Sequence, residues 1–289
     1  MTTAKRRKPI DGWRWAGRFY LTLLLIFTAL PMVWMVLTSL KSQFAAMQYP
    51  PQWWPAEPTL GNYVKLLNPS NKAGHEFLIY FWNSLYVSTL TTFFGVVVVV
   101  AVPAAYAFSR FRFPGRTFLF FSVLLRNMFP AVVFLIPLFI MMRWLGLVGT
   151  HASLVLTYLT FGLPLSIWLL KGFYDNIPVQ LEQAARIDGA TRWQAFFFIV
   201  MPLSTPGIIA TSIFSFIGAW NEYIYAATFL NNKDRMTLPV GIQRYFTEFA
   251  TDWPGLMAAT FLMSVPVVVL FLVLQKYFVR ALTEGAVKH

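Results

Sequence analysis

The stretch Leu181–Gly207, LEQAARIDGATRWQAFFFIVMPLSTPG, decides how this sequence is interpreted, because its polar first half lies between two strongly apolar segments. Val179–Ile187 consists of good helix formers, and Pro178 suits the first helical turn, where its missing N–H needs no partner. Gly189 is placed to end this helix. The pattern predicts a short amphipathic helix outside the apolar segments, whose apolar face must be covered by lipid or by a partner protein.

The second half of the stretch predicts another helix, Thr191–Met201, which leads toward the next apolar segment. Pro202 and Pro206 are expected to break this helix before that segment begins, because proline lacks the N–H that a helix interior uses. The polar helix would then be held between two proline-bounded pieces of chain.

The composition indicates an all-α membrane protein. Of the 289 residues, 57% are hydrophobic and 12% are charged, whereas a soluble domain carries about 25% charged residues. About 20 apolar residues span a bilayer as a helix, and six segments qualify as transmembrane helices. They are Arg18–Leu40, Asn83–Ala107, Thr117–Met142, Ala152–Gly172, Pro206–Leu230 and Gly255–Phe278.

The basic residues predict the orientation. With the N-terminus inside, the inner segments hold fifteen lysines and arginines and the outer segments hold seven. Cytoplasmic loops carry the excess of these residues, so both termini are expected in the cytoplasm. The net charge of +12 is then a topology signal, with some attraction to anionic membrane lipid, and does not indicate nucleic-acid binding.

This topology predicts a basic cytoplasmic N-terminus at 1–17, a six-span membrane domain at 18–280 and a cytoplasmic tail at 281–289. Within the membrane domain, an inner loop at 174–205 holds the polar helix. Outer loops at 41–82 and 231–254 are long enough to fold, and the prolines and aromatic residues of the first suggest an extended cap near the membrane surface.

No enzymatic chemistry is indicated. The sequence has no cysteine, no G-x-x-x-x-G-K-[ST] phosphate loop, and neither a G-x-S-x-G nor an H-E-x-x-H motif. We therefore expect no catalytic site, no metal site and no cofactor in this chain. An ion-coupled secondary transporter is the alternative that the residues leave open, although a single carboxylate, Glu222, lies in a predicted span and no internal repeat is visible.

The spacing in the opening stretch resembles the EAA loop of ATP-binding-cassette (ABC) importer permeases, in which E-A-A, three residues, G and nine residues precede I-x-L-P. Here the motif occurs as QAA at 183–185, Gly189, and IVMP at 199–202. Gln183 stands where glutamate is usual, with Glu182 just before it as an alternative source of the charge, and Met201 replaces a leucine. The resemblance implies that the helix sits in a cleft on a separate cytoplasmic ATPase. The residues that it assigns to this coupling are Glu182, Gln183, Ala184, Ala185, Asp188 and Gly189.

Three longer strings, LEQAARIDGAT, AWNEYIYAATFL and the tail YFVRALTEGAVKH, are similar to carbohydrate importers of the maltose type. The resemblance implies a complex, in a bacterial inner membrane, with a second permease subunit, an ATPase dimer that binds ATP and Mg, and an extracytoplasmic sugar-binding protein. In the tail it assigns ATPase contacts to Thr283, Glu284 and Gly285. It also implies that the second outer loop reaches into the sugar cleft of the binding protein, and Gln243, Arg244 and Tyr245 are the residues whose chemistry best suits that contact.

Arg126 is predicted to lie near the membrane midplane. It follows Thr117 by nine residues, and about 1.5 Å per residue places it about 13 Å into a core about 30 Å thick. An anionic sugar derivative would explain it, as would a pair with Glu222 or a structural bond to kinked backbone near Pro130. The residues of the predicted substrate path are Arg126, Asn127, Asn221, Glu222 and Tyr223.

Overall fold

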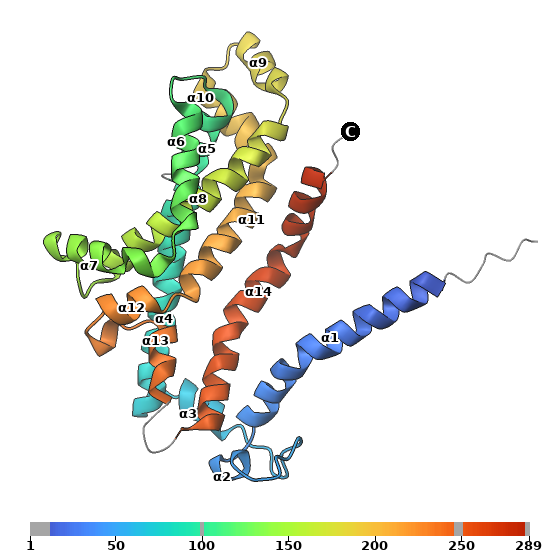
Figure 1. The fold of residues 1–289 in the computed structure, drawn as a ribbon, viewed down its shortest axis with the longest axis vertical. Helices are drawn as coiled ribbons and strands as arrows, with labels where there is room; N and C mark the ends of the chain where they lie inside the picture. Colours follow the sequence, from blue (N-terminus) through green and yellow to red (C-terminus); the bar gives the residue numbers. More distant parts are fainter. Residues whose placement is uncertain (1–11, 99–100, 246–250, 287–289) are drawn as a thin grey trace, which may run out of the picture.

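The computed structural model describes residues 12–98, 101–245 and 251–286. In this part of the chain long helices run beside one another, and short helices cap their ends (Figure 1). In chain order the elements are α1 (Gly12–Ser39), α2 (Gln43–Ala46), α3 (Gly61–Leu67), α4 (Lys72–Thr92), η1 (Phe93–Val98), α5 (Ala101–Arg110), α6 (Arg116–Leu125), η2 (Arg126–Met128), η3 (Ala131–Phe134), α7 (Leu135–Trp144), α8 (His151–Asn176), α9 (Val179–Ile187), α10 (Arg192–Ala195), η4 (Phe196–Val200), α11 (Met201–Trp220), α12 (Ile224–Phe229), η5 (Lys233–Arg235), α13 (Leu238–Ile242), η6 (Gln243–Tyr245) and α14 (Trp253–Ala286).

The prediction of an all-α membrane fold is confirmed. Over the described residues, five helical runs are long and apolar enough to cross a membrane, and a bent pair formed by α6 and α7 is a sixth candidate. The five runs are Trp15–Ser39, Lys72–Arg110, His151–Asn176, Arg192–Trp220 and Trp253–Tyr277.

The third predicted span, Thr117–Met142, is not a straight helix. The first helical piece, α6 followed by η2, and the second piece, η3 followed by α7, are bent relative to each other by 102° (Figure 1). Pro130 lies at the break, and Phe129 before it is extended, with φ −88° and ψ 134°, because a residue that precedes proline is disfavoured from the helical region. The Tyr225 hydroxyl donates a hydrogen bond to the backbone oxygen of Ala131 at 2.6 Å, which gives a partner to a carbonyl at the bend.

The prediction that Pro202 and Pro206 break the chain is wrong. α10, η4 and α11 form one helical run, Arg192–Trp220, so the span predicted at Pro206–Leu230 begins and ends earlier. The π-helical turn η4 precedes Pro202 and shifts the backbone bonding there, so that this proline falls at the start of α11. The end of the run next to α9, formed by α10, therefore connects rigidly to α11.

The outer loops are more helical than predicted. α2 and α3 lie in the first, and α4 begins at Lys72, whereas the predicted span begins at Asn83. Lys41 is buried below this cap: its Nζ donates to the backbone oxygen of Gln52 and lies 4.6 Å from the centroid of the Trp34 ring, and burial lowers the pKa of Lys41. The second outer loop is fastened to α4, because the Asn83 amide donates to two of its carbonyls at 2.9 Å.

α8 lies within the bundle and packs against α5, α4 and α11. α11 in turn packs against α14, and the buried Trp220 donates its indole N–H to the backbone oxygen of Met263 at 3.1 Å. α1 packs along α14 at one end and diverges from the bundle toward its N-terminus, where its apolar side chains are exposed (Figure 1). Membrane lipid or an apolar protein surface would cover such side chains.

α8 and α11 pack so closely at Gly207 that adding a single methyl group there tests the contact. A Cβ on Gly207 of α11 would lie 2.4 Å from Cγ of Phe173 on α8. We expect Gly207→Ala to lower the free energy of unfolding by about 1–3 kcal/mol, because the ring must move. Thermal denaturation of the purified protein measures this loss.

Gly172→Ala on α8 is the matched control, since its Cβ would meet no atom within 4 Å. This substitution is expected to stabilise by about 0.5–1 kcal/mol, the usual gain of alanine over glycine in a helix. Equal melting temperatures for the two variants would contradict the close packing of α8 on α11.

Candidate functional site

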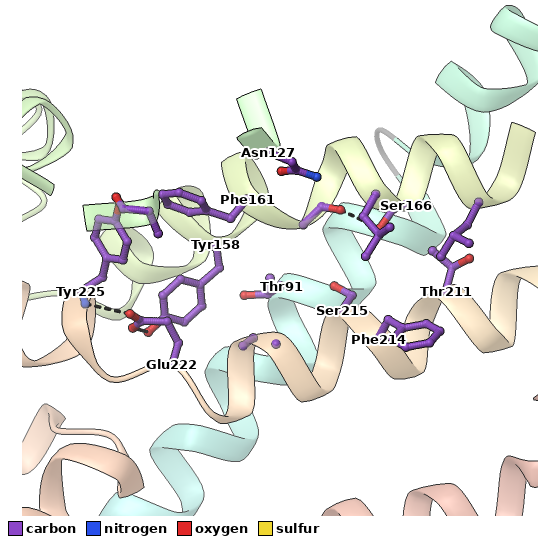
Figure 2. A pocket seen from close by; sticks show the side chains of 16 residues that line it. Thr91, Asn127, Tyr158, Phe161, Ser166, Thr211, Phe214, Ser215, Glu222 and Tyr225 are labelled. Atoms are coloured by element: carbon purple, nitrogen blue, oxygen red, sulfur yellow. Dashed lines mark hydrogen bonds between the residues drawn. The ribbon is translucent and has the colours of Figure 1, made fainter. Parts of the chain in front are cut away.

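A cavity of about 300 Å³ lies where α4, α8 and α11 meet the bend between α6 and α7 (Figure 2). Part of its wall is polar. The polar side chains include Thr91, Asn127, Tyr158, Ser166, Ser215 and Glu222. The rings of Phe161, Phe214 and Tyr225 also line it. Hydroxyl groups interspersed with apolar and aromatic surface are what a site for a small polar ligand requires.

Glu222 has a structural role at this cavity. Its carboxylate accepts from the Tyr158 hydroxyl at 2.6 Å and from the backbone N–H groups of Tyr225 at 2.8 Å and Ala226 at 3.2 Å. The carboxylate therefore caps the start of α12 and ties it to α8. With three donors already bonded, Glu222 is a poor candidate for a residue that alternately binds and releases a coupling ion.

Arg126 lies beside the cavity. Its Nη1 donates to Oδ1 of Asn127 at 3.1 Å, and its guanidinium carbon lies 3.4 Å from the centroid of the Phe161 ring. Both neighbours line the cavity. Arg126 and Glu222 are both described, and they form no ion pair, so the pairing predicted as one alternative is absent.

The remaining predicted path residues are placed differently. Asn221 is exposed, and its amide donates to the backbone oxygen of Ile217 at 3.1 Å, while Tyr223 is also exposed. Neither residue is part of the cavity wall. The cavity thus brings together Asn127 and Glu222 of the predicted set, with Arg126 next to them.

Sequence reasoning missed the polar face of α11. Thr211, Ser215 and Gly218 of α11 line the cavity at steps of four and three residues, and the predicted Glu222, just after the helix, follows at a further step of four. That spacing places small and polar side chains on one face of a helix. The signal was present in the sequence, although the opposing residues of α8 and α4 become neighbours only through the fold.

The polar helix predicted at Val179–Ile187 is α9, with the same bounds. Gly189 ends it as predicted, with φ +95°. The N–H groups of Gly189 and Ala190 donate to the backbone oxygens of Arg186 at 3.2 Å and Ala185 at 2.9 Å, the double hydrogen bond of a glycine-ended helix. α9 lies at one end of the bundle, beyond α8 and α11 (Figure 1).

Glu182 fastens α9 to the membrane helices. Its buried carboxylate accepts from the Tyr106 hydroxyl at 2.7 Å and from Nε of Arg110 at 2.5 Å, both on α5. Nη2 of Arg110 donates to the backbone oxygen of Ile177 at 2.8 Å, between α8 and α9. Glu182 therefore faces its own chain, and it is not available to supply the charge that Gln183 lacks.

The other residues assigned to coupling lie on the surface of α9 and its end. Gln183, Ala184, Asp188 and Gly189 are exposed, and Ala185 is half-buried. Ile187 has 85% of its surface exposed. Val179 and Leu181 of α9 are exposed as well, and a group of exposed apolar side chains among polar ones suits contact with a partner protein.

Only part of the second predicted outer loop is exposed and available for contact with another protein. Gln243 is exposed, whereas Tyr245 packs against the cluster formed by α3, α4, α11 and α14. Burial, helped by the nearby charges of Asp252 and Glu76, raises the pKa of Tyr245 to about 12. Arg244 lies in η6, but its side chain is outside the described part of the structure, as are residues 246–250.

The tail continues the last helix. Thr283, Glu284 and Gly285 fall within α14, although the span was predicted to end at Phe278. Residues 1–11 of the predicted N-terminal segment and residues 287–289 of the tail lie outside the described residues.

These features define a class of protein: a multi-helix membrane subunit with a polar cavity between its spans and a short helix presented at one end. A family model described as a binding-protein-dependent transport system inner membrane component matches residues 97–284. The chain belongs to this family. It is a permease subunit of an ABC importer, a multi-pass protein of the inner membrane, and not an enzyme.

Curated relatives match along nearly the whole chain. The sulfoquinovosyl glycerol transport system permease protein SmoH of Agrobacterium fabrum is 38% identical, over 92% of this chain and 91% of its own. The inner membrane ABC transporter permease protein YcjP of Escherichia coli is 36% identical, over 93% of this chain and 94% of its own. The trehalose transport system permease protein SugB of Mycobacterium tuberculosis is 35% identical, over 92% and 95%.

A solved structure shares the fold. It belongs to a bacterial ABC transporter involved in the import of the acidic polysaccharide alginate, with a TM-score of 0.77 and 22% identity, over 95% of this chain and 99% of that one. At this level of identity the likeness concerns the fold alone.

The ion pair between Glu182 and Arg110 predicts that substitutions at adjacent residues of α9 change the free energy of unfolding by different amounts. We expect Glu182→Ala to lower the free energy of unfolding by about 3–5 kcal/mol, because it leaves a buried guanidinium without its counter-ion. Gln183→Ala, one residue along and exposed, is the control and should change stability by less than about 0.5 kcal/mol. Thermal denaturation of the purified subunit measures both, and equal effects would contradict the inward orientation of Glu182.

Proposed function

We propose that this chain forms half of the translocation path of an ATP-driven, binding-protein-dependent importer for a sugar or sugar derivative. The observation that carries the proposal is α9, a short helix that is fastened to the membrane helices by Glu182 and exposes its other face. Support for a sugar comes from relatives named for the transport of trehalose and of sulfoquinovosyl glycerol, a sulfonated sugar derivative. The polar and aromatic cavity suits such a ligand.

α9 is the proposed contact with a separate ATPase dimer, which binds ATP and Mg. The exposed Gln183, Ala184, Ile187 and Asp188 would meet it, with Ile187 entering an apolar part of its surface. Because Gln183 is uncharged, the contact relies on hydrogen bonding and burial at the position where the motif usually carries glutamate.

The remaining partners follow from the same proposal. A second permease subunit would form the other half of the path. The exposed Gln243, with Arg244 and Tyr245 beside it, would contact an extracytoplasmic sugar-binding protein. The α14 end at Thr283, Glu284 and Gly285 would reach the ATPase dimer, with both termini in the cytoplasm and apolar surfaces in membrane lipid.

Ion-coupled secondary transport is not supported. Glu222, the carboxylate expected in a span, is bonded to Tyr158 and to two backbone N–H groups. The family of the chain is that of binding-protein-dependent systems.

Vesicles that contain the assembled complex test the function. We expect uptake of a radiolabelled sugar carried by the cognate binding protein only when ATP and the ATPase are both present. Gly189→Val should lower uptake per ATP hydrolysed by about tenfold, because a branched residue at a positive φ carries a strain of about 1–3 kcal/mol at the end of α9.

Gly146→Val is the matched control. Gly146 also has a positive φ, +68°, and also has open space around its Cβ, but it follows α7 and is remote from α9. Uptake that persists without the ATPase would refute the importer. Equal losses in the two variants would refute the assignment of α9 to coupling.

A further inference from the structure

Arg126 has hydrogen-bonding capacity that this structure does not use. Its Nη1 bonds to Asn127, but its Nε and Nη2 are buried and have no hydrogen-bond partner. A guanidinium carries five N–H donors and keeps its charge in proteins. Buried donors of a charged group are costly to leave unpaired, so the arrangement calls for a partner that the described residues do not provide.

Glu222, the carboxylate of the cavity wall, does not supply that partner. The carboxylate of Glu222 is bonded to Tyr158 and to the backbone at the start of α12. Arg126 instead lies over the Phe161 ring, with its guanidinium carbon also 5.3 Å from the centroid of the Phe134 ring. Attraction between the cation and the aromatic faces holds the charge in place without neutralising it.

The unused donors lie next to the cavity. Asn127 and Phe161, which touch the guanidinium, both form part of the cavity wall, and Figure 2 shows them above the cavity with Tyr158 and Glu222 nearby. The guanidinium sits at the end of a flexible stem. A rotation of that stem away from Phe161 would direct the guanidinium fork into the cavity.

The cavity lining as a whole suits the neutral part of a sugar. Ser215 and Tyr158 present hydroxyl groups, and the hydroxyl of Thr91 is buried without a partner. Phe161 and Phe214 offer aromatic faces. A volume of about 300 Å³ is at the small end for ligand pockets and favours a small sugar derivative over a long chain.

We infer that Arg126 binds an anionic group, a sulfonate, carboxylate or phosphate, carried by the transported sugar. The guanidinium fork would donate hydrogen bonds from Nε and Nη2 to two oxygens of that group. This inference rests on the proposed function, since it places the sugar in the cavity between the spans.

A cysteine at Ser215 tests the charge of the cavity without knowledge of the substrate. Ser215→Cys gives the chain its only thiol, because the sequence contains no cysteine. The assembled complex in lipid nanodiscs is treated with two thiosulfonate reagents of similar size, one with a sulfonate and one with a trimethylammonium group. The mass of this chain reports each rate, with and without ATP, relative to a free thiol.

We expect Arg126→Gln to lower the ratio of the sulfonate rate to the ammonium rate by about tenfold, since a nearby unit charge acts oppositely on the two reagents. Arg143→Gln on α7 removes the same charge from an exposed position and should leave the ratio unchanged. An unchanged ratio in Arg126→Gln, an equal change in Arg143→Gln, or a thiol that reacts in neither state would overturn the inference.

A second measurement needs no arginine variant and decides the matter if Arg126→Gln does not assemble. The probes are 6-deoxy-6-sulfoglucose, glucuronate and glucose 6-phosphate, with glucose as the neutral control. We expect one or more of the anionic sugars to slow modification of Ser215→Cys at concentrations where glucose does not. Equal protection by glucose, or no protection by any of the three, would overturn the inference. Neither measurement requires transport, so its failure is distinguishable from loss of ATP-driven uptake.

Discussion

The ion pair between Glu182 and Arg110 is the constraint on which the α9 end of this protein depends. α9 has nine residues, and helices shorter than about 12–15 residues are marginal in water on their own. The buried carboxylate ties this helix to α5 through Arg110 and Tyr106, and Arg110 also holds the connection to α8 at Ile177. Because each partner would otherwise be a buried, unpaired polar group, the three elements are held in one arrangement.

In that arrangement, helices that pack directly against one another connect α9 to the cavity. α5 packs extensively against α8, and α8 supplies Tyr158, Phe161 and Ser166 to the cavity wall. The uninterrupted run from α10 through α11 provides a second path, which ends at Ser215 and Glu222. A displacement of α9 by an ATPase would therefore reach both walls of the cavity through packed helices, with no flexible loop between.

The sequence predicted some of these features and could not predict others. Helix propensity, Pro178 and Gly189 were sufficient for the bounds of α9, because the signals are local. The inward orientation of Glu182 was not predictable, since its partners lie more than 70 residues away and meet it only in the fold. Proline alone was ambiguous: Pro130 breaks its span, whereas a π-helical turn accommodates Pro202. The sequence also could not predict that two donors of Arg126 are unpaired, because this depends on the hydrogen bonds that Glu222 makes to Tyr158 and to the backbone in the fold.

The most direct test is the distance between α9 and α8 during the ATP cycle. Spin labels at Arg186 of α9 and Trp168 of α8, both exposed, can be attached through two introduced cysteines in a chain that has none. Pulsed electron paramagnetic resonance then gives the distance distribution in the complex with and without ATP. If the Glu182 link unites these helices, the distribution stays narrow and unchanged on ATP binding, and it broadens in Glu182→Gln. If the distance between the two labels shifts on ATP binding in the protein that keeps Glu182, the account is contradicted.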